Sequence, residues 1–542
     1  MKNIEIPLVK DRDRIYRLFE MLPGAISWFI LSIPIVLSLI SPRLAAIFLV
    51  AYLLLWFIKT MAMTGRMIQG YKRLNNATAT NWYDHAKELD DPEKTFARYE
   101  EGISPPWHYR NLIRRQARPK DRANLDEIFH GIIIAVVNES KDIVGPTLDS
   151  VAASNYPLQK LVVVITVEER GGPETVKAMN SLADKYKKVF KHISVVVHPK
   201  DLPNEVIGKG GNITYAGRQI KKYFDKQKLD PKNIIITTLD CDNRPHPQYF
   251  AAVSYAYLAC PDPYHASFQP ISLFTNNIWD VPAPMRVIAT GNSFWNIVVS
   301  LRPHMLRNFA SHSQTLKTLI DTDFWSTRTI VEDGHQFWRT YFTYNGKNEV
   351  YPLMVPIYQD AVLDVTIKKT LRAQFVQIRR WAWGASDIAY VLQTGWRRKN
   401  NISKTDLLFK TSRLIEGHTS WATAPLLILL GAWVPLYIAP DASDSFVANE
   451  LPIIASYIQR IAMVGLIASI FLSIRLLPPK PPHYKTRHRL YMVLQWVYLP
   501  ITTILYSCFA ALNSQTRLIF GRYLGKFDLT AKAVKTSSGN RK

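Results

Sequence analysis

Two carboxylates one residue apart, Asp240 and Asp242, follow an apolar stretch of the chain. Carboxylate oxygens are the ligands that Mg²⁺ and Mn²⁺ prefer, and such an ion can bridge the phosphates of a diphosphate. An ion held there would stabilise the charge on a departing nucleotide. The same pattern occurs in ordinary surface loops, so its position at the end of a predicted strand is what favours a metal site.

A second acidic pair, Glu332 and Asp333, lies in the segment VEDGHQFWR. One carboxylate of such a pair can act as a general base, because its charged neighbour raises its pKa. Both residues would also suit the first turn of a helix, where acidic side chains interact favourably with the helix dipole. These two interpretations are compatible. Arg339 lies about two turns further along the same predicted helical face and is expected to hold the acidic pair.

Gln377, Arg380 and Trp381 form a third group, after the basic stretch IKKTLRAQFV. The guanidinium of Arg380 can pair with diphosphate oxygens, and Trp381 offers a flat face on which a sugar ring can stack. The alternative is a basic amphipathic helix that lies on anionic lipid. A fourth segment begins with Lys209-Gly-Gly and opens a predicted helix, whose N-terminus favours an anion; a plain junction between loop and helix has the same pattern.

These residues need a frame that brings them together, and the chain predicts one from residue 131 onwards. Helical stretches near 142–153, 174–189 and 212–226 alternate with short β-rich runs at 131–137, 160–166, 192–198 and 233–239. Continuous apolar strands separated by helices indicate a mostly parallel α/β sheet covered on both faces. Ligands of such sheets bind beyond the carboxyl ends of the strands. Polar residues follow three of the predicted strands directly: Asn138, Glu139, Glu168, Glu169, Asp240 and Asp242.

Five apolar runs flank this region and are long enough to span a bilayer, at 21–42, 44–63, 419–440, 455–474 and 490–516. The excess of Lys and Arg before the first run predicts a cytosolic N-terminus. Two spans then return the chain to the cytosol, so the central domain is predicted to be cytosolic. Five spans place the basic C-terminal tail outside, against the charge rule, so either the last run is re-entrant or the rule fails there. We expect five spans.

Composition narrows the class of protein further. The net charge is +24 over 542 residues. Because much of the basic excess flanks apolar runs, anionic lipid headgroups are the expected partner, and nucleic acid is not, since no recognised nucleic-acid module appears. The three cysteines form neither a paired framework nor a metal-ligand spacing: Cys241, Cys260 and Cys508.

The order of these motifs, with membrane helices on both sides, resembles the inverting family-2 glycosyltransferases that are integrated in membranes. Gln-x-x-Arg-Trp after Glu-Asp is specific to those members, and the nearest motif matches are cellulose, chitin and hyaluronan synthases and ceramide glucosyltransferase. The resemblance covers residues 130–385 in motifs and the whole chain in layout. It implies a Rossmann-like GT-A fold, a UDP-sugar donor and Mg²⁺ or Mn²⁺.

On the donor side, the resemblance implies that Glu168 or Glu169 contacts the nucleotide. Asp240 would contact both nucleotide and metal, and Asp242 would ligate the metal. The segment ITVEERGG stands where the family usually has Asp-Asp-Gly-Ser, so the nucleotide contact is placed to within a residue or two. The expected donor-binding set is completed by the other polar and basic motif residues, Asn138, Glu139, Lys209 and Arg380.

On the acceptor side, the resemblance makes Asp333 the general base that deprotonates the acceptor hydroxyl, with Glu332 beside it in the catalytic pair. Gln377 and Trp381 would hold the acceptor sugar. The usual Gly-rich segment before the Glu-Asp motif reads Ala310-Ser-His-Ser in this chain, which changes the expected geometry of the acceptor site.

The expected organisation has six parts: an N-terminal tail with two membrane helices (1–64), a basic juxtamembrane collar lying against headgroups (65–125), a GT-A nucleotide-sugar domain (126–345), acceptor and interface helices (346–415), about three membrane helices (416–516) and a basic tail (517–542). The leading hypothesis is a processive polysaccharide synthase in the plasma membrane. The alternative is a single-transfer enzyme that glycosylates a membrane lipid. A non-enzymatic scaffold or nucleic-acid binder is a third, less favoured possibility. The sugar, the linkage and the oligomeric state stay open.

Overall fold

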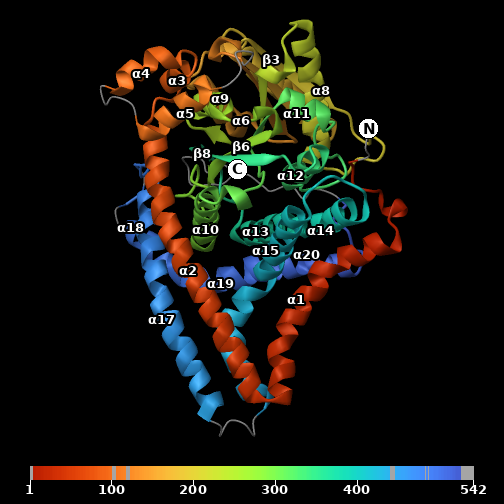
Figure 1. The fold of residues 1–542 in the computed structure, drawn as a ribbon, viewed down its shortest axis with the longest axis vertical. Coiled ribbons are helices and arrows are strands. Elements are labelled where there is room, and N and C mark those ends of the chain that lie inside the picture. Colours follow the sequence, from red (N-terminus) through yellow and green to blue (C-terminus); the bar gives the residue numbers. More distant parts are fainter. Residues whose placement is uncertain are drawn as a thin grey trace.

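The structure is a computed structural model, and it describes residues 4–100, 105–117, 123–439, 446–482, 484–485 and 488–525. It has an α/β domain at one end and a group of long apolar helices at the other, with short crosswise helices between them (Figure 1). The predicted fold class, a mostly parallel α/β sheet joined to an α-helical apolar region, is confirmed.

The centre of the α/β domain is an eight-stranded sheet in the order β3-β2-β1-β4-β7-β6-β8-β5. The strands β3, β2, β1 and β4 run parallel to one another. Strand β7 runs antiparallel to both of its neighbours, and β6 and β8 are parallel to each other. The strands are β1 (Phe129–Val136), β2 (Leu161–Glu168), β3 (His192–His198), β4 (Ile234–Asp240), β5 (Arg244–Pro245), β6 (Ala266–Leu273), β7 (Ser313–Thr315) and β8 (Glu349–Tyr358).

Both faces of the sheet are covered, as the continuous apolar strands predict. Ile132 and Ile134 of β1 pack with α6 (Lys141–Ala152), α7 (Pro173–Asp184) and α9 (Tyr249–Ala259) on one face. Ile133 points to the other face and packs with α8 (Lys209–Lys226) and α11 (Leu316–Asp321). Because successive side chains of a strand point to opposite faces, β1 contributes residues to two hydrophobic cores.

Three further helices carry predicted motifs or connect them: α12 (Glu332–Thr343), which precedes β8, and α13 (Ile367–Ala382) and α14 (Asp387–Val391), which follow it. A fourth, α10 (Ala283–Ser300), packs against β6 on the side of the apolar helices.

The region predicted as a juxtamembrane collar forms α3 (Trp82–Glu88), α4 (Pro92–Glu100) and α5 (Pro106–Gln116). The rings of Trp82 and Trp107 lie 5.1 and 5.7 Å from the ring of Tyr255 in α9. These helices therefore pack on the α/β domain, at the end of the molecule that lies away from the tip of the long apolar helices (Figure 1).

Within the described residues, five helical segments are long and apolar enough to cross a membrane. Four of them run side by side away from the sheet in Figure 1: α1 (Arg14–Ile40), α2 (Pro42–Ala79), α15 (Lys404–Leu430), which a short turn joins to α16 (Val434–Ile438), and α17 (Phe446–Arg475). Large apolar side chains on their outer faces are exposed, for example Phe29, Ile58 and Ile467. Such faces suit hydrocarbon as the solvent.

The fifth segment, His488–Ile519, differs from the other four. It is broken into α18 (His488–Leu494), α19 (Leu499–Thr502) and α20 (Phe509–Ile519), with a π-helical stretch between the last two. Figure 1 shows α19 and α20 lying across the direction of the long helices, beneath the α/β domain.

Both ends of this segment contact residues on the side of the α/β domain. Before it, the hydroxyl of Tyr484 donates to Asp280 in the loop that precedes α10 (2.7 Å). At its last residue, the carbonyl of Ile519 accepts a hydrogen bond from Arg17 in the first turn of α1 (2.6 Å). Apolar length alone predicts a fifth span, and in this geometry the two ends of the segment contact Asp280 and Arg17.

This arrangement predicts the side on which the tail lies. Residues 526–542 of the tail, residues 441–445 of the first loop and Thr486 of the second lie outside the described residues, so labelling must test it. A cysteine at Ser538 should react from the same side as one at Thr486, and from the opposite side to one at Ser443, when an impermeant thiol reagent is added to sealed vesicles. The native cysteines are buried and serve as the unlabelled control. Labelling of Ser538→Cys and Ser443→Cys from one side would restore the five-span arrangement.

Candidate active site

A buried ion pair joins the end of β4 to the start of α8. Lys209 Nζ lies 2.7 Å from Asp240 Oδ1, and the lysine side chain is 9% exposed. Burial alone would lower the pKa of Lys209, but the carboxylates of Asp240 and Glu332 outweigh it and raise that pKa, so the ammonium stays charged. The predicted Lys-Gly-Gly motif does open a helix, and its lysine faces the acidic motif that follows β4.

The start of α8 is held close to two other elements. A β-carbon at Gly210 would lie 2.2 Å from the carbonyl oxygen of Ser326 and 3.2 Å from the β-carbon of Glu332, so only glycine fits there. The amide oxygen of Asn212 accepts from the hydroxyl of Thr166 in β2 (2.6 Å). The same helix end is thereby tied to the strand ends and to the start of α12.

The predicted catalytic pair forms the first turn of α12. Glu332 is 3% exposed, whereas Asp333 is only partly buried and accepts from the backbone N–H of Gly334 (2.7 Å). Burial and the adjacent Asp333 raise the pKa of Glu332 to about 8. Burial also raises the pKa of Asp333, against the charges of Lys209 and Arg380. Of the two carboxylates, Asp333 is therefore the one with access to a ligand.

Two buried interactions position α12. His335 Nδ1 lies 2.8 Å from Asp387 of α14. Arg339 does not hold the Glu332 and Asp333 pair as predicted: it pairs with Glu5 near the N-terminus (2.8 Å) and donates to the carbonyl of Thr322 (2.6 Å). The helix over this segment was predicted correctly, but local sequence could not show that Glu5 lies beside Arg339. The N-terminal segment is a part of the site that sequence reasoning missed.

Asp242, the second carboxylate of the strand-end motif, is buried, with 5% of its surface exposed. Its Oδ2 accepts from the backbone N–H of Asp360 (3.2 Å), and its carbonyl accepts from Asn276 (2.9 Å). Asp360 lies two residues after the end of β8 and brings another carboxylate to this edge of the sheet. Its position after an apolar strand was a usable sign in the sequence, but that strand was not predicted.

Asp240 and Asp242 together suit a hard divalent cation, because both offer carboxylate oxygens and because the side chain of Asp240 is one-third exposed. Mg²⁺ or Mn²⁺ matches these ligands. Among the described residues, no histidine, cysteine or further carboxylate lies close enough to both aspartates to form a three-residue metal-ligand group. The remaining oxygens would therefore come from a bound diphosphate or from water.

Arg380 belongs to the same cluster, since its charge lowers the pKa of Asp333. It lies near the end of α13 with the other two residues of its motif. The side-chain oxygen of Gln377 accepts from Gln374 (3.1 Å), and the ring of Trp381 lies 5.9 Å from that of Phe274. α20 packs against α13, and Ser514 donates to the carbonyl of Arg379 (2.6 Å).

The predicted residues after β1 and β2 form a neighbouring group. Glu139 accepts from the backbone N–H of Val137 (2.7 Å). Glu168 is buried and paired with Arg170, and burial raises its pKa. Two other residues of this group are more exposed: Asn138, and Glu169, which accepts from the backbone N–H of Lys200.

The strand register relates this group to the acidic motif. Ala135 of β1 lies opposite both Asp240 of β4 and Thr166 of β2. Adjacent strands are about 4.8 Å apart, so the ends of β2 and β4 are separated by about 10 Å. One extended ligand can reach both groups.

No protein-family model matches the chain, and no curated protein matches it. Among solved structures it is similar to a mannosyltransferase, PcManGT, from Pyrobaculum calidifontis in complex with GDP-Man and Mn²⁺, at 13% identity over 85% of this chain and 100% of that one, with a TM-score of 0.40. It is also similar to S. aureus TarS 1–349 in complex with UDP-GlcNAc, at 12% identity over 76% of this chain and 95% of that one, with a TM-score of 0.36. Likeness at this level carries no argument about function, which rests on the geometry above.

The raised pKa of Glu332 predicts a pH-dependent stability. The folded state keeps a proton on Glu332 that the unfolded chain releases between about pH 4.5 and pH 8. This residue therefore makes the free energy of unfolding fall as pH rises through that window. Glu332→Gln, which stays neutral at the same shape, should show a smaller decrease in Tm from pH 5 to pH 8 than the wild type. The exposed Glu349→Gln is the matched control, and equal slopes in all three proteins would contradict the assignment.

Proposed function

We propose that this chain is an inverting glycosyltransferase that moves a sugar from a UDP-sugar to an acceptor held at the membrane. One observation carries the proposal: Lys209, Asp240 and the Glu332–Asp333 pair converge at the carboxyl ends of the strands, with Arg380 beside them. Lys209 and Arg380 are cations that can bind a diphosphate, and Asp333 is a carboxylate that can accept a proton from a hydroxyl group. These groups lie close together, as a displacement between a donor and an acceptor requires.

The reaction follows from the roles that these residues can take. Asp333 accepts the proton of the acceptor hydroxyl as its oxygen attacks the anomeric carbon. The bond from that carbon to the diphosphate oxygen breaks on the opposite face, so the configuration inverts and the electron pair leaves with UDP. Lys209 and Arg380 lie where they can offset the charge of the diphosphate.

A divalent ion bound with the donor would supply further charge stabilisation for the leaving UDP. Asp240 and Asp242 would hold it. Glu332 stays protonated over part of the neutral range, because its pKa is raised to about 8. It therefore limits the negative charge beside Asp333, which must itself be ionised to act as the base.

The acceptor site is proposed at α13, where Gln377 and Trp381 hold the acceptor sugar. This helix lies between the α/β domain and the crosswise α20 (Figure 1). An acceptor anchored in the membrane would approach from that direction. We favour a growing polysaccharide as the acceptor, and product sizing separates it from a membrane lipid: a ladder or polymer supports a synthase, whereas one added sugar per lipid supports the alternative.

The proposed location is the plasma membrane, with the α/β domain in the cytosol. The N-terminal segment supports this, because basic residues precede α1 and because Glu5 and Ile4 contact the α/β domain through Arg339 and Tyr390. We propose four crossings, by α1, α2, α15 with α16, and α17. The crosswise segment His488–Ile519 then keeps the basic tail in the cytosol, which agrees with the charge rule.

Arg460, in the middle of α17, does not line an internal path in this arrangement. Its side chain is exposed, and its guanidinium lies 5.3 Å from the ring centre of Tyr457 on the same helix. Snorkelling toward an interface accounts for such a residue.

Replacing Asp333 by asparagine tests the base. The change keeps the shape of the side chain and the contact with Gly334 but removes the basic lone pair, so turnover should fall by about 10²–10⁴-fold. UDP binding should stay close to that of the wild type, because other residues hold the donor. Asp323→Asn, an exposed aspartate paired with Arg218, is the control. An Asp333→Asn enzyme with near-normal transfer of labelled sugar would remove the proposed base.

Replacing Asp242 by asparagine tests the metal. An amide oxygen can still accept from the backbone N–H of Asp360, so the fold should persist while the ion loses a charged ligand. The variant should show no transfer at any Mn²⁺ concentration. The wild type should lose transfer after EDTA and regain it when Mn²⁺ is added, whereas the variant should not. Transfer that survives both treatments would exclude a metal role for this residue.

A further inference from the structure

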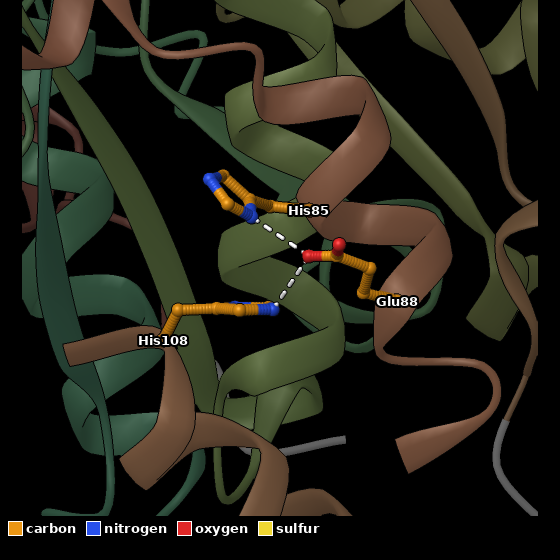
Figure 2. A group of neighbouring side chains, drawn as sticks. All are labelled: His85, Glu88 and His108. Carbon is orange, nitrogen blue, oxygen red and sulfur yellow. Dashed lines mark hydrogen bonds and ion pairs between the residues drawn. The ribbon is translucent and has the colours of Figure 1, made fainter. Parts of the chain in front are cut away.

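Three side chains that could ligate a metal meet in the collar, apart from the proposed active site. His85 and Glu88 lie three residues apart in α3 and so share one helical face. His108 comes from α5 and points at them (Figure 2). Glu88 Oε2 lies 2.8 Å from His85 Nδ1 and 2.9 Å from His108 Nε2, and one ligand atom from each residue lies within 4.8 Å of the others.

The buried imidazole of His108 is fixed from its far side. Its Nδ1 lies 2.9 Å from the hydroxyl of Tyr255 in α9, which also accepts from the amide of Asn111 (2.9 Å). Hydrogen bonds at the second nitrogen of a histidine orient the ring and set which nitrogen carries the proton. With the proton on Nδ1, a lone pair at Nε2 points toward His85 and Glu88.

Among the described residues, this lone pair has no good donor. Although Nε2 is close to Glu88, the direction is wrong for a hydrogen bond, and the fully buried Nε2 makes none within the described parts of the chain. A cation between the three side chains would satisfy this atom.

We propose that His85, Glu88 and His108 bind a divalent transition-metal ion of the zinc class, which fastens α3 and α5 together against α9. Two imidazole nitrogens and one carboxylate oxygen are a ligand set that zinc uses, at about 2.0–2.2 Å from the ion. The pair Asp240 and Asp242 has oxygen ligands alone and suits Mg²⁺ or Mn²⁺ instead. The two sites thus differ in ligand chemistry.

The surroundings leave room for the ion and for a fourth ligand. The side chains of His85 and Glu88 are about one-fifth exposed, so water can enter and complete the coordination. Arg98 lies 3.5 Å from the other carboxylate oxygen, Oε1, and its side chain is two-thirds exposed. Oε2 therefore remains available, and the guanidinium can move away from an incoming cation.

The ion would bind where the collar meets the α/β domain. Trp82 and Trp107 pack on Tyr255 beside the cluster, and the backbone N–H of Trp82 donates to Gln248, next to the start of α9. A metal joining α3 to α5 would fix these contacts, and with them the cytosolic end of α2.

Zinc content and thermal stability of the full-length protein in detergent test the proposal. Each protein is stripped with chelator, reloaded with Zn²⁺ in excess Mn²⁺ and desalted. The wild type should then retain about one more zinc per chain than His85→Ala or Glu88→Gln, because each variant lacks one ligand. Added Zn²⁺ should raise the Tm of the wild type by about 3 °C or more, and chelator should reverse it. Both variants change partly exposed residues, which limits damage to the fold.

His265→Ala is the matched control, because His265 pairs with Asp262 three residues away in the same way but outside the cluster. It should retain zinc like the wild type. Co²⁺ provides a second readout: the wild type and His265→Ala should show its tetrahedral absorption bands, and His85→Ala should not. Equal zinc retention and equal Tm shifts in all four proteins, or no retained zinc in the wild type, would overturn the proposal. Neither result depends on glycosyl transfer.

Discussion

The ion pair of Lys209 and Asp240 is the interaction on which the site depends. It places a positive charge, 9% exposed, among three carboxylates: Asp240, Glu332 and Asp333. Without the ammonium group the negative charges of Asp240 and Asp333 would repel each other in a medium that screens them poorly. The same lysine begins α8, so its position is fixed by helix packing as well as by charge.

The remainder of the site is organised around that charge by contacts between distant parts of the chain. α12 carries the acidic pair and is held through His335 by Asp387 and through Arg339 by Glu5, which precedes the first apolar helix. α13 carries Arg380 and is backed by α20, the last described helix. The apolar helices and the acidic pair are therefore parts of one packed unit. This coupling suits a reaction whose donor is soluble and whose acceptor belongs to the membrane.

The sequence predicted the first half of the sheet well, because a buried parallel strand is a continuous apolar run. β1 to β4 lie within two residues of their predicted bounds. The second half was missed for physical reasons: β7 has three residues and is polar, and β6 contains Pro270. Polar strands of this kind are defined by the neighbours with which they pair, and local composition does not reveal those neighbours.

The candidate site shows the same division between local and distant information. Strand ends and helix starts were readable, which placed Asp240 at the end of a strand and Lys209 and Asp333 at the starts of helices. Their place in one site was implied by the family resemblance alone. Contacts across hundreds of residues were not, so Arg339 was assigned to the wrong partner and Glu5 was overlooked. Hydropathy likewise found the segment at 490–516 but could not tell a crossing helix from one that lies crosswise, because both need the same apolar length.

The central claim is that the cluster around Lys209 and Asp240 binds a nucleoside diphosphate together with a divalent ion. Calorimetric titration of UDP into the purified protein, with and without Mn²⁺ and with GDP as a comparison, measures this directly. The account predicts that UDP binds the wild type with a Kd below about 1 mM in Mn²⁺, and that binding is lost without the ion and in Asp240→Asn. Absence of UDP binding in Mn²⁺, or equal binding by Asp240→Asn, would contradict it.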